Sequence, residues 1–413
     1  MELNRCTERR EASWSLTEAV EQNTATDTLA DAWNARLPER LLLGAGPSVV
    51  PPKVYEAMAL PTIGHMDPIF GKIMEEVAAL LRETFRTTNE ATLPVSATGS
   101  GGMETMIANL IEPGDRVICG VIGVFGERMA DALRRQGAEV LCVEGEWGRA
   151  LDLERLHEVG SADYDAMVLV HGETSTGVAQ PLDGLADLCR ERDALLLVDC
   201  VTSLAGHPLE IDAAGVDAAF SGSQKCLNCP PGLAPLTIGE RAIERITGSP
   251  RSWYFDLSAV LGYWSEGTAN RVYHHTAPIN MIYALRAALE LIHEEGLEQR
   301  WRRHTRAHAA LAGALAELGL ERVPPEDEAL HSLLAVHVPD HLDEAAVRGA
   351  LLEEDGIEIS GGLGRLAGRI WRIGVMGAGA QREVQERLVT TLARRIHASP
   401  ANAFSALEDG WRL

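Results

Sequence analysis

From residue 41 onward the chain alternates short apolar runs with amphipathic stretches, and this alternation constrains the fold more than any other feature of the sequence. Such a pattern is typical of an α/β domain, in which helices cover a mostly parallel sheet. Two of the runs, at 116–121 and 194–198, are almost continuously apolar, as expected of strands covered on both faces. Seven strands are predicted, at 92–97, 116–121, 139–143, 166–171, 194–199, 218–221 and 233–238. We expect them to form one sheet.

Helical patterns separate several of these strands, at 102–111, 125–136 and 182–192. Beyond Pro278 a long helical pattern runs from 279 to about 319, with a break near Gly296. A smaller α+β unit follows, with strands at 333–338, 357–360 and 370–375 and helices at 343–354 and 382–397. We therefore predict an N-terminal extension at 1–40, a large domain at 41–295 with a mostly parallel seven-stranded sheet, and a smaller C-terminal α+β domain at 296–413.

Charge and composition narrow the classes of partner. The 60 acidic residues exceed the 37 basic ones, and the net charge of −23 argues against nucleic acid and anionic lipid. No apolar run approaches the ~20 residues of a membrane helix, and residues 1–40 lack the apolar stretch of a secretory signal. Seven cysteines at irregular spacing do not suggest a disulfide framework, so we expect a soluble protein of the reducing cytoplasm.

Two polar features follow predicted strands, where ligands of parallel sheets bind. Residues 97–102 read Ala-Thr-Gly-Ser-Gly-Gly and open a helix, so their backbone N–H groups can hold a phosphate, although glycines also serve packing alone. Asp199 directly follows a buried strand, where a carboxylate is costly unless it has a partner. It either caps the next turn or faces a cationic ligand atom.

A single lysine stands out, because the chain contains only Lys53, Lys72 and Lys225. Lys53 and Lys72 lie in polar, helix-like settings and are interpreted as surface residues. Lys225 follows an apolar strand and has no other charge in its flanks. It is either an ordinary solvated lysine or a desolvated amine of lowered pKa that serves as a nucleophile or Schiff-base partner. The loop at 171–177 adds hydroxyls that can donate to a ring oxygen or a phosphate, or only stabilise a turn.

These features together predict one site for pyridoxal 5′-phosphate. The phosphate would lie on the 98–102 turn, Asp199 against the pyridine nitrogen, and Lys225 in the Schiff base. An anionic Asp199 keeps that nitrogen protonated, so the ring can accept electrons from a carbanion at the substrate Cα. Lys225, once displaced by the substrate amine, would lie beside Cα as general base.

The ordered motifs of the chain resemble those of fold-type I, class V aminotransferases, and within that class the alanine:glyoxylate and serine:glyoxylate aminotransferases. The resemblance covers about residues 41–392. It rests on Leu-Leu-Gly-Ala-Gly-Pro-Ser at 42–48, Ile-Gly-His-Met at 63–66, His-Gly-Glu-Thr-Ser-Thr-Gly at 171–177, Gln-Pro-Leu-Asp-Gly at 180–184, Leu-Leu-Val-Asp at 196–199, Ser-Gly-Ser-Gln-Lys at 221–225, Pro-Pro-Gly at 230–232, Tyr-His-His-Thr at 273–276 and Arg-Ile-Gly at 372–374.

The resemblance implies a role for each matching residue. It implies Lys225 as the Schiff-base lysine, Asp199 at the pyridine nitrogen and Thr174 near the ring hydroxyl. Further implied cofactor contacts are Thr98, Gly99, Ser100 and Gln224 around the phosphate, Val201, and Phe125 where the family stacks an aromatic ring, often tryptophan. Tyr273 and Thr276 match residues that reach the phosphate from a neighbouring subunit, which implies a homodimer with composite sites. Gly64 and His65 are implied in substrate choice.

Arg372 lies inside the apolar run 370–374, where a charged residue needs a partner. A buried structural ion pair is one interpretation. The other, which the resemblance supports, is a bidentate clamp on the substrate α-carboxylate. One clamp would serve donor and acceptor alike in a ping-pong cycle, since both are small carboxylic acids.

We therefore predict transamination from a small amino acid to glyoxylate, which gives glycine and the matching oxo acid. Alanine is favoured as donor, because Tyr273 resembles the alanine:glyoxylate branch, whereas the ureidoglycine:glyoxylate branch carries asparagine there. Cys226-Leu also appears in that second branch, and serine is the closest alternative. Cysteine desulfuration and a non-catalytic binding role are weaker alternatives. Cys226 and Cys229 have zinc-like spacing without a second pair, so no metal site is expected.

Overall fold

The computed structural model describes residues 37–159, 163–246, 248, 250–264 and 271–412. The predicted extension at 1–40 lies almost entirely outside these residues. From Leu41 onward the chain forms one compact unit.

Seven strands form the central sheet, and all seven predicted strands are confirmed. Their order across the sheet is β2-β10-β9-β8-β5-β3-β4. Every pairing from β9 to β4 is parallel, and β10 alone runs against the other six strands. Their bounds are β2 (Ala91–Val95), β3 (Arg116–Val121), β4 (Glu139–Glu144), β5 (Ala166–Val170), β8 (Leu195–Asp199), β9 (Ala218–Phe220) and β10 (Ala234–Ile238).

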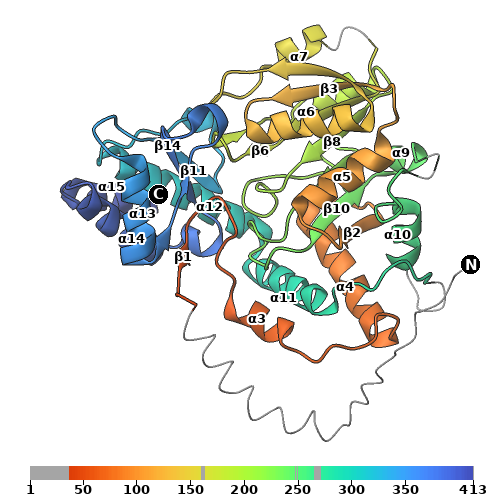
Figure 1. The fold of residues 1–413 in the computed structure, drawn as a ribbon, viewed down its shortest axis with the longest axis horizontal. Helices are drawn as coiled ribbons and strands as arrows, with labels where there is room; N and C mark the ends of the chain where they lie inside the picture. Colours follow the sequence, from red (N-terminus) through yellow and green to blue (C-terminus); the bar gives the residue numbers. More distant parts are fainter. Residues whose placement is uncertain (1–36, 160–162, 247, 249, 265–270, 413) are drawn as a thin grey trace, which may run out of the picture. The chain divides into compact units, whose positions relative to one another are not determined.

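Helices cover this sheet, as the apolar strands require. The main ones are α4 (Pro68–Phe85), α5 (Gly99–Leu110), α6 (Val124–Gln136) and α8 (Leu185–Arg190), with α3 (Pro52–Met58), α7 (Leu153–Val159), α9 (Glu240–Glu244) and α10 (Leu257–Trp264) around them (Figure 1). Local chemistry sets their ends: Asp67 caps α4 by accepting from the N–H of Ile69, and Arg86 ends it with a φ of +55°. The helix predicted at 182–192 is shorter than expected.

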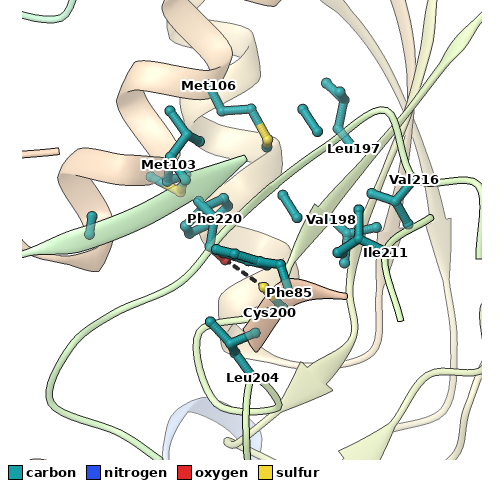
Figure 2. Close-up of a cluster of buried hydrophobic side chains, with 14 of the residues drawn as sticks. Phe85, Met103, Met106, Leu197, Val198, Cys200, Leu204, Ile211, Val216 and Phe220 are labelled. Atoms are coloured by element: carbon teal, nitrogen blue, oxygen red, sulfur yellow. Dashed lines mark hydrogen bonds between the residues drawn. The ribbon is translucent and has the colours of Figure 1, made fainter. Parts of the chain in front are cut away.

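The core of the large domain lies between these helices and the sheet. Figure 2 shows a part of it, in which Phe85 of α4 and Met103 and Met106 of α5 lie near Val198 and Phe220 of the central strands. All of these side chains are buried. The interior therefore fixes the strands whose carboxyl ends carry the predicted site.

The long C-terminal helical pattern forms two helices, α11 (Ile279–Glu295) and α12 (Leu297–Ala316), which meet at Gly296 with a φ of +83°. The smaller sheet has the order β11-β14-β13. The elements of this region are β11 (Leu333–His337), α13 (Glu344–Asp355), β12 (Ile357–Glu358), β13 (Ser360–Gly361), β14 (Ile370–Gly374), α14 (Arg382–Arg395) and α15 (Ala401–Arg412). The strand predicted at 357–360 is thus two short strands, and α15 was not predicted.

Two main hydrophobic clusters underlie the fold. One runs from Val54 to Trp301, and the other contains residues from Ala307 to Leu407 together with Leu43. Leu43 joins the second cluster because β1 (Leu41–Leu42) pairs in parallel with β12. The domain boundary at residue 295 stays a prediction. Within the described residues, no helix is long and apolar enough to cross a membrane.

Candidate active site

A pocket opens at the carboxyl ends of the parallel strands. The segments that follow these strands all lie at this edge of the sheet. Most of the predicted cofactor residues line the pocket. The lining residues are Gly99, Ser100, Met103, Phe125, Arg128, Val170, Gly172, Thr174, Asp199, Val201, Thr202, Phe220, Gln224 and Lys225. Five segments of the sequence, one after each of β2, β3, β5, β8 and β9 or at its end, thus meet at one place.

The glycine-rich turn after β2 forms the first wall of the pocket. Thr98 caps α5 without lining the pocket, and the N–H groups of Gly101 and Gly102 bond to its carbonyl. A Cβ on Gly99 would lie 3.3 Å from Val201 Cγ2 and 3.6 Å from Gly222 Cα, so a larger residue would crowd the opposite wall. The first N–H groups of α5 and its dipole favour an anion at this position.

Asp199 ends β8, where it is paired in register with Val170 and Phe220. Its side chain is 8% exposed. Oδ1 accepts a hydrogen bond of 2.8 Å from the Val201 N–H. Burial raises the pKa of the Asp199 carboxyl to about 7, against that hydrogen bond and the nearby Lys225 amine, which both lower it. A cationic ligand atom would keep this carboxylate charged at neutral pH.

Lys225 lies in the loop after β9 and lines the pocket. Nζ donates a hydrogen bond to the carbonyl of Ala45. A Cβ on Gly46, which has a φ of +103°, would lie 2.6 Å from Lys225 Nζ, so the side chain passes directly over this glycine. Burial and then the charge of Arg372 lower the pKa of the Lys225 amine to about 8. About a tenth of the amine is therefore neutral and nucleophilic at pH 7, far more than for a lysine in water.

Arg372 is buried on β14 and does not line the pocket, but it contacts Thr174, which does. Its Nη1 donates to the carbonyl of Thr174 at 3.3 Å, and its Nε donates to that of Gly361 at 2.8 Å. Among the described residues, it makes no ion pair within 4 Å, which the structural interpretation would require. It also borders a groove lined by Arg348 and Ser360. Arg372 therefore has guanidinium donors available to a carboxylate ligand.

Glu173 is a residue that sequence reasoning missed. This fully buried carboxylate accepts hydrogen bonds from the N–H groups of Phe125 and Gly126 at 3.1 Å each, and from the N–H and hydroxyl of Ser175 at 3.0 and 2.6 Å. It thus fixes the start of α6, where Phe125 lines the pocket. Arg128, also missed, lies over the Phe125 ring at 4.8 Å. Its position one helical turn after Phe125 was the available signal.

Six predicted residues do not line this pocket: Thr98 and Arg372, which adjoin it, and Gly64, His65, Tyr273 and Thr276, which form a second group. The His65 and Tyr273 rings are in contact, with centroids 5.1 Å apart, and Tyr273 is 58% exposed. His275, between Tyr273 and Thr276, bonds through Nε2 to the hydroxyl of Ser96 at 2.7 Å, close to the glycine-rich turn. This second group is therefore a surface group in the described chain.

The remaining candidates have structural surroundings. Lys53 is exposed and pairs with Glu290 and Glu294, and Lys72 is exposed. Cys226 and Cys229 are buried, and burial raises their thiol pKa values to about 11 and about 12. In the part of the chain that the structure describes, no group of three or more His, Cys, Asp or Glu could hold a metal ion.

Comparison with known proteins identifies the class. A family model of class V aminotransferases matches residues 41–370, and the chain belongs to this family. It is 39% identical to an alanine–glyoxylate aminotransferase of Callithrix jacchus over 95% of this chain and 96% of that protein. An alanine–glyoxylate aminotransferase of Nostoc sp. superposes with a TM-score of 0.85 at 45% identity, covering 87% of this chain and 96% of that one. The ureidoglycine–glyoxylate aminotransferase of Bacillus subtilis superposes with a TM-score of 0.88 at 37% sequence identity, covering 91% of this chain and 99% of that one.

The protein is therefore a transaminase of fold-type I that uses pyridoxal phosphate. The residues of the pocket fit this group. The buried Oε1 of Gln224 has no hydrogen-bond partner within the described chain. Since Gln224 lines the pocket, its amide is available for a hydrogen bond to a bound ligand. Asp199 provides a carboxylate and Lys225 an amine, and the start of α5 favours a phosphate.

Proposed function

We propose that this enzyme transfers the amino group of alanine to glyoxylate, with Lys225, Asp199 and Arg372 at its centre. The observation that carries the proposal is that Lys225 and Asp199 line one pocket, while Arg372 donates to the carbonyl of Thr174 on its wall and its charge acts on Lys225. The relatives of the chain include enzymes named for alanine and glyoxylate. Serine and ureidoglycine are alternative donors, the second because a ureidoglycine–glyoxylate enzyme is also similar to this chain.

Each residue has one task in this proposal. The cofactor, when bound, stabilises negative charge that develops at the substrate Cα. Asp199 provides the negative charge that holds the ring nitrogen protonated. Lys225 moves the proton at Cα, and its lowered pKa suits a base near neutral pH. Arg372 binds the α-carboxylate of both donor and oxo acid and orients Cα.

Two alternative reactions have less support. Cysteine desulfuration needs a nucleophilic thiol on a mobile loop, whereas Cys226 is fully buried and donates to the carbonyl of Thr202 at 3.3 Å. A binding protein without catalysis would not need a desolvated lysine beside a cationic clamp.

The test mixes the cofactor-loaded protein separately with alanine, serine, aspartate and ureidoglycine, and follows the visible absorbance of the cofactor. We expect alanine to bleach the band fastest and glyoxylate to restore it. Faster bleaching by another donor would reassign the donor. A band that no donor bleaches would contradict the proposed transamination.

We also propose a homodimer in which Tyr273 and Thr276 complete the partner's site, with Gly64 and His65 beside them. The support is an apolar surface formed by α3, the loop after it, the start of α4 and the segment at 272–273. Its exposed side chains are Tyr55, Met58, Leu60, Met66, Ile69, Val272 and Tyr273. The hydrogen bond from Arg271 to the Gly71 carbonyl joins residues 271–273 to α4, and the ring contact of Tyr273 with His65 joins them to the loop after α3. A patch of this kind marks an association surface.

Light scattering after size exclusion tests the dimer. Ile69→Arg, at a position 63% exposed, should give monomers that lose activity, while Ala316→Arg at an exposed helix position outside the patch should stay dimeric. A fully active monomer would contradict composite sites. We further propose a cytoplasmic location, which the six unpaired cysteines of the described chain support.

A further inference from the structure

One carboxylate and two arginines form a cluster behind the lysine loop, at the junction of α11 and α12. Glu295 is the last residue of α11. Its carboxylate accepts hydrogen bonds from Arg300 Nη1 at 2.7 Å and from Arg303 Nε and Nη2 at 2.6 and 2.9 Å. One carboxylate thus holds two guanidinium groups. We call these three residues the Glu295 cluster.

Arg300 connects the cluster to the lysine loop. Its side chain is 7% exposed. Nη2 donates to the carbonyl of Cys226 and to Oδ1 of Asn228, both at 2.6 Å, and Nε donates to the carbonyl of Ala205 at 3.2 Å. Each of its three nitrogens donates to an acceptor, so the guanidinium restricts the movement of the residues that follow Lys225.

From Asn228 the hydrogen bonds continue to Lys225 itself. Asn228 Nδ2 donates to Ser48 Oγ at 2.8 Å, and Ser48 Oγ donates to the Lys225 carbonyl at 2.7 Å. Arg300, Asn228 and Ser48 thus form a chain of hydrogen bonds in which each residue donates to the next, and the chain ends at the Lys225 carbonyl. Asn228 has a φ of +53°, in the left-handed region that asparagine adopts more readily than most residues, and both ends of its side-chain amide are held by hydrogen bonds.

Arg303 connects the same carboxylate to the segment after β14, the strand that carries Arg372. Its Nη1 donates to the carbonyl of Gly377 at 2.9 Å and to that of Ala380 at 3.1 Å. A Cβ on Gly377 would overlap the Asn228 amide, so this segment also touches the lysine loop directly. The cluster therefore holds two segments that lie about 150 residues apart in the sequence.

We propose that the Glu295 cluster positions Lys225 relative to Arg372, and so fixes the spacing between the groups that handle the amino and carboxylate ends of the substrate. This inference rests on the function proposed above for those two residues. The spacing matters because the two ends of an α-amino acid are a fixed distance apart, and a misplacement of about 1 Å costs on the order of a hundredfold in rate. Glu295, Arg300 and Arg303 do not line the pocket and are positioning residues.

Arg300 and Arg303 contact different segments, so we expect their substitution to change different kinetic constants. Arg300→Met releases the lysine loop, so we expect kcat to fall about tenfold, with faster amide exchange at 226–229. Arg303→Met releases the segment after Arg372, so we expect KM to rise about tenfold for both the amino acid and the oxo acid. Glu295→Gln should produce both effects, because Glu295 holds both arginines.

The experiment uses the cofactor-loaded enzyme and three measurements: half-reaction kinetics, hydrogen–deuterium exchange at 223–229 and 375–380, and a pH titration of the cofactor absorbance. Arg302→Met, at an exposed position of the same helix, is the matched control. Arg300→Lys keeps a buried cation and should recover part of kcat. It also keeps the proposal testable if the methionine variant does not fold.

Each outcome decides the proposal. The predicted split between kcat and KM, with a shifted titration in Arg300→Met, supports positioning. Variants that lose only thermal stability, while kinetics and titration match Arg302→Met, overturn it and leave the cluster structural. If the wild-type enzyme transaminates none of the four donors, the proposed function fails. Exchange and titration then still decide whether the cluster holds the lysine loop.

Discussion

Burial sets the protonation of two residues that line the pocket, Lys225 and Asp199. In water their pKa values differ by roughly six units. Burial lowers the pKa of Lys225 to about 8 and raises that of Asp199 to about 7, so both groups titrate near neutral pH. A neutral amine is the form that attacks a carbonyl carbon, and Asp199 gains a charge where a protonated ring nitrogen faces it.

This electrostatic arrangement predicts how fast the apo-protein takes up pyridoxal phosphate. Since the neutral amine reacts, the rate should rise about tenfold per pH unit below a pH of about 8 and level off above it. Arg372→Ala removes a positive charge that lowers the pKa of Lys225, so it should move the midpoint to higher pH. Stopped-flow absorbance measures the rate. A pH-independent rate, or a midpoint unchanged in Arg372→Ala, would contradict this explanation.

At the scale of elements, α12 and α15 cross closely at a glycine. A Cβ on Gly410 of α15 would lie 2.5 Å from Ala310 Cα of α12, which is backbone and cannot turn aside. Gly313, on α12 and facing α15, has room: its nearest neighbour would be Ala406 Cβ at 4.0 Å. Two glycines of one helix pair thus differ in the space around them.

Alanine at each glycine should have opposite effects. Gly410→Ala should lower the free energy of unfolding by about 1–2 kcal/mol, because the steric cost exceeds the gain in helix propensity. Gly313→Ala should raise it by about 0.5–1 kcal/mol through helix propensity alone. Urea denaturation measures both, and Gly313→Ala serves as the control. A stabilised Gly410→Ala variant would mean that the helices move apart easily.

Sequence reasoning predicted the elements whose pattern is local and missed those that depend on distant contacts. The seven strands follow from apolar runs, and the break at Gly296 from glycine. Helix α15 is an exception, because its apolar residues Ala403, Phe404, Leu407 and Trp411 follow a local helical spacing that the prediction overlooked. Glu173 was missed although its motif was noted, since its role lies in contacts with Phe125 and Gly126, nearly fifty residues earlier.

At the scale of the whole molecule, four histidines that are far apart in the sequence lie in a row. The ring centroids of His171 and His207 are 5.5 Å apart, those of His207 and His331 4.4 Å, and those of His331 and His308 6.0 Å. Burial lowers the pKa of His171 to about 4 and that of His308 to about 3, and moves that of His207 well below its usual value. These rings are neutral in the folded protein at neutral pH.

Acid should therefore destabilise the fold through these rings. The unfolded chain protonates these rings near pH 6.5, whereas the folded chain protonates His171 only near pH 4 and His308 only near pH 3. The unfolded state therefore binds more protons below pH 6.5, and the free energy of unfolding falls as the pH falls through this window. Each histidine should add up to about 1.4 kcal/mol per pH unit to the slope of unfolding free energy in this window. Urea denaturation at several pH values should show a shallower slope for His308→Leu than for the wild-type protein. Equal slopes would contradict the assignment.

The central claim for the molecule is that Lys225, of its three lysines, carries the cofactor. Reduction of the loaded enzyme with borohydride fixes the cofactor to its lysine, and peptide mass spectrometry then locates it. We predict a pyridoxyl group on the peptide that contains Lys225, and none on those that contain Lys53 or Lys72. A modified Lys53 or Lys72 with an unmodified Lys225 would contradict this claim, and so would a Lys225→Ala variant that keeps the visible band.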